Sequence, residues 1–153
     1  IGAGGLAVLV FLSGHPALNN GAVAAQYLQV AAAKIQLPPL TAFFSGVLCN
    51  ALVCMAVWMA YAGRSVVDKA VAIIFPVSAF VAAGFEHSIA NIYLIAMAML
   101  VQAFDSGAVA GPALTWHGFM SNMVPVLLGN IVGGSVLVGL VFHIIYHRAK
   151  PGA

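Results

Sequence analysis

Long apolar runs without charges alternate with short polar stretches along this sequence. The charge-free runs are residues 35–63, 70–85, 88–104 and 106–147. About 20 apolar residues are enough to cross a bilayer as a helix, so the longest runs are too long for single buried helices of a soluble protein. They predict membrane spans with their connecting loops: helices over 40–62 and 121–147, and a broken helix over 70–104.

Polar stretches predict the connections between these spans. The apolar segment 1–14 is too short to cross a bilayer and predicts part of a helix. Residues 15–39 predict an outer loop with a short surface helix, because the loop-forming residues there lead into a weakly amphipathic stretch closed by two prolines. Residues 63–69 predict a hinge, and the Gly-rich residues 105–120 predict a second outer loop.

The stretch 70–104 cannot be one straight helix. Its 35 residues would make a helix about 52 Å long, whereas the hydrocarbon core of a bilayer is about 30 Å thick. Gly84 and Ser88 flank the charged and polar pair Glu86–His87 near its centre, and these residues predict a break there. Irregular backbone at membrane depth is tolerated only where it is buried in protein or lines a cavity.

Composition agrees with a membrane protein and excludes other classes. Apolar residues make up 63% of the chain and charged residues only 5%, against about 25% charged in soluble domains. The five Lys and Arg residues form no basic cluster, so we expect no nucleic acid partner. We expect the lipid bilayer to surround the chain.

The basic residues also predict an orientation. Taking the spans alternately, Arg64, Lys69, Arg148 and Lys150 share one side of the membrane and Lys34 lies on the other. Lys and Arg are enriched in cytoplasmic loops. The hinge and the C-terminus are therefore predicted to be cytoplasmic.

Glu86 and His87 are the leading candidates for a functional role, because ionisable residues inside a membrane are costly and usually mark a pathway. On a helix they point about 100° apart, so we expect one to line a cavity and Glu86 to brace the break. Counted inward from their helix ends, Asn50 and Asn130 lie about 14 to 15 Å deep, near the depth of His87. Either these groups share a polar spot along a pore, or the Asn side chains only hydrogen-bond neighbouring helices.

Other patterns are weaker. His143 and His147 share one helix face with spacing that suits a metal or haem, but His is also favoured at a helix C-terminus. No metalloprotease, nucleophile or phosphate-binding motif is present, and Asp105 has no acidic partner. We expect neither enzyme activity, nor a cofactor, nor a bound metal. Gly129, Gly133, Gly134 and Gly139 have the small-residue spacing of closely packed membrane helices.

Four longer motifs carry a resemblance to a known family. They are Pro76–Val77 with Gly84–Asn91, Cys49–Trp58, Gly63–Ser65 with Asp68–Lys69, and Pro125–Val126 with Gly129–Gly134. Together they resemble the formate/nitrite transporter family, most closely its formate channels. The resemblance implies an all-α, aquaporin-like bundle of six membrane helices in two inverted repeats, assembled as a homopentamer with one pore per subunit.

The same resemblance implies roles for individual residues. His87 would be the central pore histidine, with Asn50 and Asn130 near it. Lys34 would supply positive field to the pore, and Phe80 and Val53 would form apolar constrictions beside His87.

We expect this chain to begin within the family's third helix and to hold the second repeat. The function expected is passage of formate, or a similar small monovalent weak-acid anion, across the bacterial inner membrane. Nitrite or hydrosulfide passage is an alternative, as is a haem- or metal-bearing membrane anchor of an enzyme.

Overall fold

The computed structural model describes residues 1–104 and 113–148, which form helices and no strand. The chain divides into two units. Unit 1 comprises Ile1–Thr41 and Ser88–Pro125, and unit 2 comprises Ala42–His87 and Val126–Ala153. Helices α3 (Pro39–Ala62) and α6 (Trp116–Ile131) each have residues in both units.

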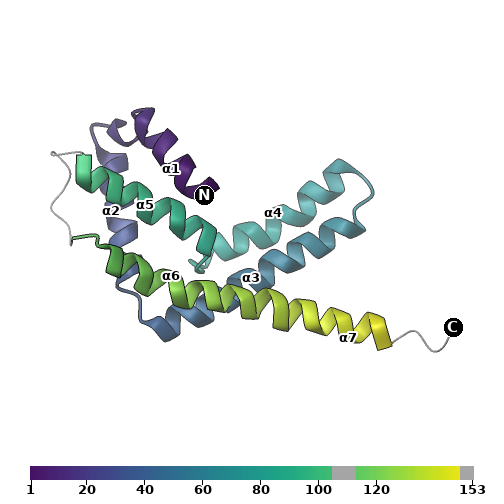
Figure 1. Ribbon diagram of the computed structural model, residues 1–153. Coiled ribbons are helices and arrows are strands. Elements are labelled where there is room, and N and C mark those ends of the chain that lie inside the picture. Colours follow the sequence, from purple (N-terminus) through teal and green to yellow (C-terminus); the bar gives the residue numbers. More distant parts are fainter. Residues whose placement is uncertain (105–112, 149–153) are drawn as a thin grey trace. The chain divides into compact units, whose positions relative to one another are not determined.

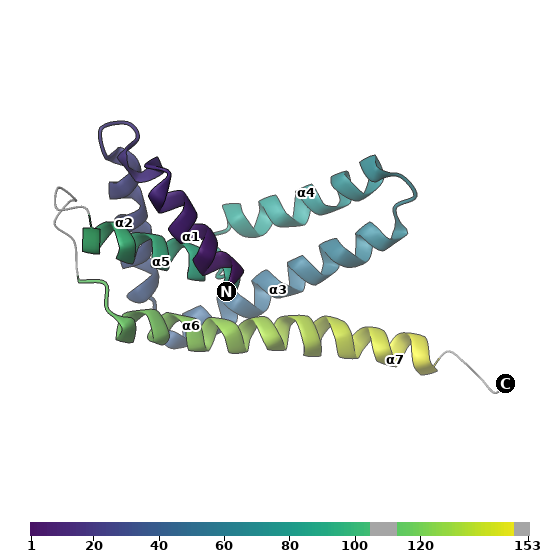
Figure 2. The ribbon, with the colours of Figure 1, turned by 45° about the horizontal axis from the view of Figure 1, so that its top comes forward.

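Unit 1 is built around α5. Its elements are α1 (Gly2–Leu12), the short 3₁₀ helix η1 (His15–Ala17), α2 (Ala22–Ile35), α5 (Ser88–Phe104) and the first part of α6. Helix α5 packs against both α1 and α2 (Figure 2). The buried residues are mostly small or flexible: Ala7, Ala24, Leu28, Ala31, Ile95, Met97, Ala98 and Val101. Small side chains let the helix axes approach closely, which is a common way for membrane helices to gain contact.

The connection between α1 and α2 depends on residues that tolerate left-handed backbone. Gly14 has φ of 78°, Asn19 and Asn20 both have φ of 55°, and Gly21 has φ of 84°. Glycine adopts positive φ without a steric cost, and asparagine does so more readily than other side chains. The polar stretch that predicts a loop therefore forms a tight turn before α2.

Unit 2 contains a helical hairpin and a long third helix beside it. Its elements are α3 (Pro39–Ala62), α4 (Val66–Ala82), the second part of α6 (Trp116–Ile131), η2 (Val132–Leu140) and α7 (Val141–Arg148). Figure 1 shows α3 and α4 running back along each other and the continuous α6–η2–α7 rod lying along α3. The η2 segment is wound as a π-helix, a rare geometry with wider turns than the α-helix.

Two helices begin earlier than the apolar runs predict, because polar residues cap them. Helix α4 starts inside the predicted hinge, where Ser65 and Asp68 form a reciprocal capping box. Helix α6 starts at Trp116 rather than at residue 121, and the Thr115 hydroxyl accepts the Gly118 N–H at 3.1 Å. Of the predicted loop 105–120, residues 105–112, including Asp105, lie outside the described part.

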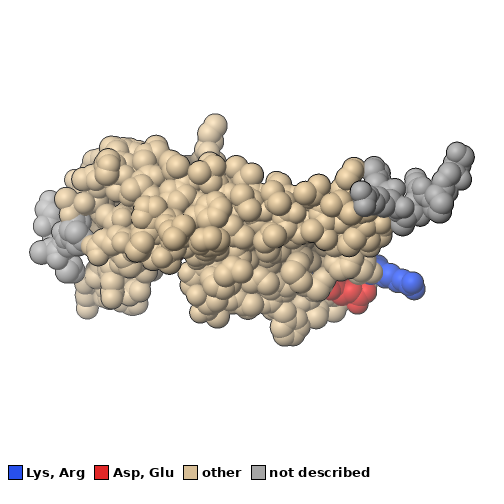
Figure 3. Space-filling model, turned by 90° about the horizontal axis from the view of Figure 1, so that it is seen from below, with Lys and Arg blue, Asp and Glu red and all other residues tan. Residues whose placement is uncertain are grey.

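Within residues 1–104 and 113–148, two helices are long and apolar enough to cross a membrane. They are Pro39–Ala62, with 24 residues, and the continuous rod Trp116–Tyr146, with 31 residues. Helices α1 and α5 are apolar but shorter. The face of the molecule in Figure 3 is almost entirely uncharged, as the composition requires.

Candidate functional site at the helix break

Helices α4 and α5 are separated by residues 83–87, within the stretch where the sequence predicts a break. Gly84 has φ of 68°. The Phe85 N–H donates to the Phe80 carbonyl at 3.0 Å, and the Gly84 N–H donates to the Val81 carbonyl at 3.1 Å. This pair of bonds is the Schellman motif, which ends a helix at a left-handed residue. The break is therefore encoded locally, and Gly84 is the residue that permits it.

Backbone groups in the break are satisfied by side chains from two other helices. The Glu86 N–H donates to the Ser45 hydroxyl of α3 at 3.0 Å. The Glu86 carbonyl accepts from the Asn130 side-chain amide of α6 at 3.1 Å, and the same amide donates to the Gly46 carbonyl at 2.9 Å. An unpaired backbone group away from water costs several kcal/mol. The two bonds to Glu86 remove that cost where the helix is interrupted.

Asn50 extends this arrangement along α3. Its side-chain amide donates to the Asn130 backbone carbonyl at 2.6 Å, near the junction of α6 and the π-helical η2. Asn130 is only 6% exposed and Asn50 is half-buried. The structure therefore brings Asn50, Asn130 and the break together. The sequence predicts only that these groups lie at a similar depth in the membrane. Asn50 and Asn130 thus make hydrogen bonds between helices, and their place along a pore stays a prediction.

His87 lies at the end of the break and stacks on Phe80. The two ring centroids are 5.7 Å apart and the ring planes are inclined by 21°. Both residues are half-buried. Phe80 lies in the last turn of α4, so the turn at Gly84 folds His87 back over the end of that helix. Val53 is half-buried on α3, one turn beyond Asn50.

Glu86 and Ser88 are both buried, with exposed fractions of 4% and 8%. Ser88 is the first residue of α5. The sequence assigns Glu86 to bracing the break, and the structure shows that the backbone of Glu86 is held on both sides. Ser45, which holds one side, has no signal in the sequence beyond being a hydroxyl residue inside an apolar run.

Glycines allow α3 and the continuous α6–η2 segment to approach closely at this site. A Cβ at Gly129 would overlap the Phe43 carbonyl oxygen, and a Cβ at Gly133 would overlap the Val47 carbonyl oxygen. These positions are four apart on each helix, which is the small-xxx-small geometry. A Cβ at Gly134 would overlap the side-chain amide nitrogen of Asn50. The predicted close contact is thus confirmed for these three glycines, whereas Gly139 meets only its own helix at the Gly134 carbonyl.

Lys34 belongs to unit 1, in the last turn of α2, and is half-buried. Its carbonyl accepts from the Asn122 side-chain amide at 2.9 Å, and the Asn122 side-chain oxygen accepts from the Asn91 amide at 2.8 Å. Sequence reasoning gave Asn91 and Asn122 no role. Asn91 and Asn122 could have been found by the same feature that singles out Asn50 and Asn130, which is a carboxamide side chain inside an apolar helix.

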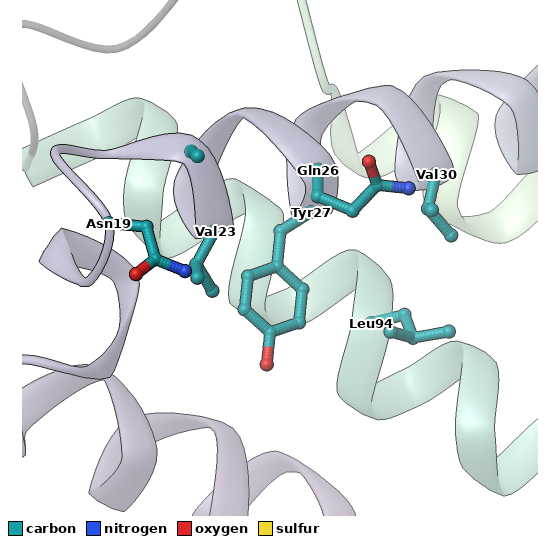
Figure 4. A pocket seen from close by; sticks show the side chains of 7 residues that line it. Asn19, Val23, Gln26, Tyr27, Val30 and Leu94 are labelled. Carbon is teal, nitrogen blue, oxygen red and sulfur yellow. The ribbon is translucent and has the colours of Figure 1, made fainter.

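A pocket of about 390 Å³ also lies in unit 1, between α2 and α5. Figure 4 shows its lining: Asn19, Ala22, Val23, Gln26, Tyr27, Val30 and Leu94. The Tyr27 and Tyr93 hydroxyls are 2.9 Å apart. Burial, followed by this hydrogen bond, raises the pKa of Tyr27 to about 12. None of the predicted pore residues lines it.

His143 is exposed on α7, whereas the side chain of His147 lies outside what the structure describes. In residues 1–104 and 113–148, no three His, Cys, Asp or Glu side chains are grouped so that they could hold a metal ion.

Comparison with known proteins identifies relatives that match nearly the whole chain. The chain is 42% identical to the formate channel FocA of Escherichia coli K12, over 97% of this chain and 55% of that protein. It is 38% identical to formate-nitrite transporter 3 of Toxoplasma gondii, over 92% of this chain and 27% of that protein. The chain thus spans about half the length of FocA. These relatives are named as a channel and a transporter and not as enzymes.

Solved structures give the same result for the fold. A pentameric formate channel with formate bound superimposes with a TM-score of 0.88 at 35% identity, over 95% of this chain and 61% of that chain. An ion channel of the FNT family superimposes with a TM-score of 0.79 at 34% identity, over 98% and 55% of the two chains. The predicted all-α channel fold with a broken helix is confirmed. The family model for formate/nitrite transporters matches residues 1–144, and the chain therefore belongs to the formate/nitrite transporter family.

Proposed function

We propose that the intact protein conducts formate, or a similar small monovalent weak-acid anion, through a pore in each subunit with His87 at its centre. The observation that carries this proposal is the helix break, where a half-buried imidazole lies directly beside a backbone segment held by Asn130 and Ser45. The similarity to formate channels supports the choice of anion.

The chemistry of His87 suits a weak acid. An anion entering an apolar passage loses its hydration, which is costly unless a charge or a proton compensates. An imidazole titrates near neutral pH, so His87 can lend a proton or a positive charge at the point of greatest dehydration. Formate then passes as the neutral acid or as an ion pair.

The neighbouring residues take supporting roles in this proposal. Phe80, stacked on His87, and Val53 on α3 form the apolar walls on either side. Asn50 and Asn130 offer polar groups near the histidine, while Asn130 also holds the broken backbone. Lys34 raises the positive potential that attracts the anion toward the pore.

Assembly and orientation belong to the same proposal. A homopentamer in the bacterial inner membrane, with a cytoplasmic C-terminus, agrees with the similarity to a pentameric formate channel and with the distribution of Lys and Arg. Mass measurement of the intact protein in detergent tests the pentamer, and a stable monomer or trimer would contradict it.

The decisive experiment compares formate flux in liposomes from pH 5 to pH 8 for the intact wild-type protein and His87→Phe at equal incorporation. The substitution keeps a ring of similar size and removes the titrating group, so flux should fall or lose its dependence on pH. His143→Phe, on the exposed face of α7, is the control and should keep the wild-type profile. Superimposable profiles for wild type and His87→Phe would contradict the mechanism.

Nitrite and hydrosulfide are the alternative substrates. Flux of each, measured in the same liposomes at two pH values, ranks them against formate. A clear preference for either would keep the channel and change its substrate.

A further inference from the structure

Asn122 joins two parts of unit 1 through its side-chain amide. It is 1% exposed, and its partner Asn91 is fully buried. The nitrogen of Asn122 donates to the Lys34 carbonyl at 2.9 Å, and its oxygen accepts from Asn91 at 2.8 Å. One carboxamide on α6 thus connects the last turn of α2 to the first turn of α5.

The Lys34 carbonyl lies in the last turn of α2, where the regular hydrogen-bond ladder of the helix ends. The Leu37 N–H also donates to it, at 3.2 Å. A carbonyl oxygen has two lone pairs, so the Asn122 bond adds a fixed contact from another helix to this helix end. The backbone from which the Lys34 side chain extends is therefore held in place from α6.

We infer that Asn122 is a positioning residue for Lys34. The inference rests on the proposed function, in which the Lys34 ammonium supplies positive field to the pore. Asn122 does not touch the anion. Without it, the last turn of α2 loses this hydrogen bond to α6. The ammonium is then spread over more positions, which weakens the local potential that draws the anion in.

A double-mutant cycle in the intact protein tests the inference. Lys34→Met removes the ammonium and leaves the carbonyl that Asn122 binds, and Asn122→Leu removes both hydrogen bonds at similar volume. Formate flux is measured in liposomes over a range of formate concentrations. Each single variant should raise the half-saturating concentration by up to about tenfold, within the range for electrostatic attraction of ligands. The double variant should be no worse than Lys34→Met alone.

A structural role for Asn122 gives a different result. If Asn122→Leu lowers flux by the same factor with and without the Lys34 ammonium, the effects are independent and the inference is wrong. Tyr93→Phe is the matched control, since it removes a hydrogen bond within unit 1 that involves neither Lys34 nor Asn122. Its effect should be independent of Lys34.

The dependence of the half-saturating formate concentration on ionic strength is a second measurement. It reports the charge that attracts the anion, and a general loosening of the fold does not change it. Salt screens charges, so the wild-type half-saturating concentration should rise with ionic strength, and Asn122→Leu should flatten this rise as Lys34→Met does. Asn122→Ser, a smaller polar replacement, is measured in the same way if the Leu variant is not recovered as a folded oligomer. An unchanged salt dependence in the recovered variant would overturn the inference.

These outcomes separate the inference from the proposed function. If Lys34→Met leaves the concentration dependence unchanged, Asn122 has no charge to position and the inference fails, although flux that depends on His87 would still support the channel. If the wild-type protein conducts no formate, the proposed function itself fails.

Discussion

The side-chain amide of Asn130 donates to the backbone carbonyl of Glu86 at 3.1 Å, so a residue of α6 holds the break between α4 and α5. The break would otherwise leave polar backbone inside an apolar environment. The bond gives Asn130 a structural task in addition to the proposed pore role. Loss of Asn130 should therefore affect folding and conduction together.

Replacing Asn130 should destabilise the protein measurably. Asn130→Leu removes the donors to the Glu86 and Gly46 carbonyls, and leaving a buried acceptor unpaired costs about 1–3 kcal/mol. Ser135→Ala, at an exposed site on η2, is the control. The midpoint of thermal unfolding in detergent should fall for Asn130→Leu and stay near wild type for Ser135→Ala. Equal midpoints for the two variants would mean that the amide does not hold the break.

A single methyl group at Gly129 should disturb the packing of α3 against α6. The Cβ of Gly129→Ala would overlap the Phe43 carbonyl, which is backbone and cannot turn away, and overpacking of this kind costs about 1–3 kcal/mol. Gly139→Ala is the matched control, because its Cβ would lie 3.4 Å from the Gly134 carbonyl oxygen, an ordinary contact. Thermal unfolding should separate the two, and a stable Gly129→Ala would show that the helices can move apart freely.

Gly84 should tolerate asparagine better than alanine. Nothing lies within 4 Å of a Cβ at this position, so the cost of substitution is the left-handed backbone alone, about 1–2 kcal/mol for a side chain such as alanine. Asparagine adopts this conformation more readily. The unfolding midpoint should fall in the order wild type, Gly84→Asn, Gly84→Ala. The reverse order for the two variants would mean that the turn at residue 84 does not limit stability.

The start of α4 should loosen at low pH. Hydrogen bonds from the Ser65 N–H, the Ser65 side chain and the Arg64 N–H lower the pKa of Asp68 below its ordinary value of 3.8. A group whose pKa is lowered by folding contributes stability above its unfolded pKa, and this contribution is lost as pH falls through the folded pKa. The capping box should therefore be complete at neutral pH and weaken below about pH 4.

Hydrogen exchange of the amides in the first turn of α4 measures this effect. In wild type their protection should decline as pH falls from 6 to 3, after correction for the intrinsic exchange rate. Asp68→Ala should show weak protection at every pH in that range. Protection that is the same in both proteins at pH 6 would contradict the role assigned to the carboxylate.

Much of the helical architecture follows from local sequence. The apolar runs predict the spans because hydropathy and length decide which segments can cross a bilayer. Gly84 with Glu86 and His87 predicts the break. The signal is local, because a glycine that can adopt left-handed backbone lies within a few positions of ionisable residues that are costly inside a membrane. The family is also recognisable in the sequence, because its motifs are short contiguous segments. The capping residues Ser65 and Thr115 carry local signals too, and they explain why α4 and α6 start before their apolar runs.

Tertiary structure alone decided the partners of the polar residues. Glu86 is bonded to Ser45 and Asn130, which are 41 and 44 positions away, and Asn122 is bonded to Lys34, 88 positions away. Hydropathy and helical periodicity show which side chains are polar and how deep they lie. They do not show which helix faces meet, because that depends on packing between segments, as at Gly129 against the Phe43 carbonyl. The sequence by itself therefore determined the helices, the break and the family, whereas the hydrogen bonds that hold the break were decided by the packing of the folded chain.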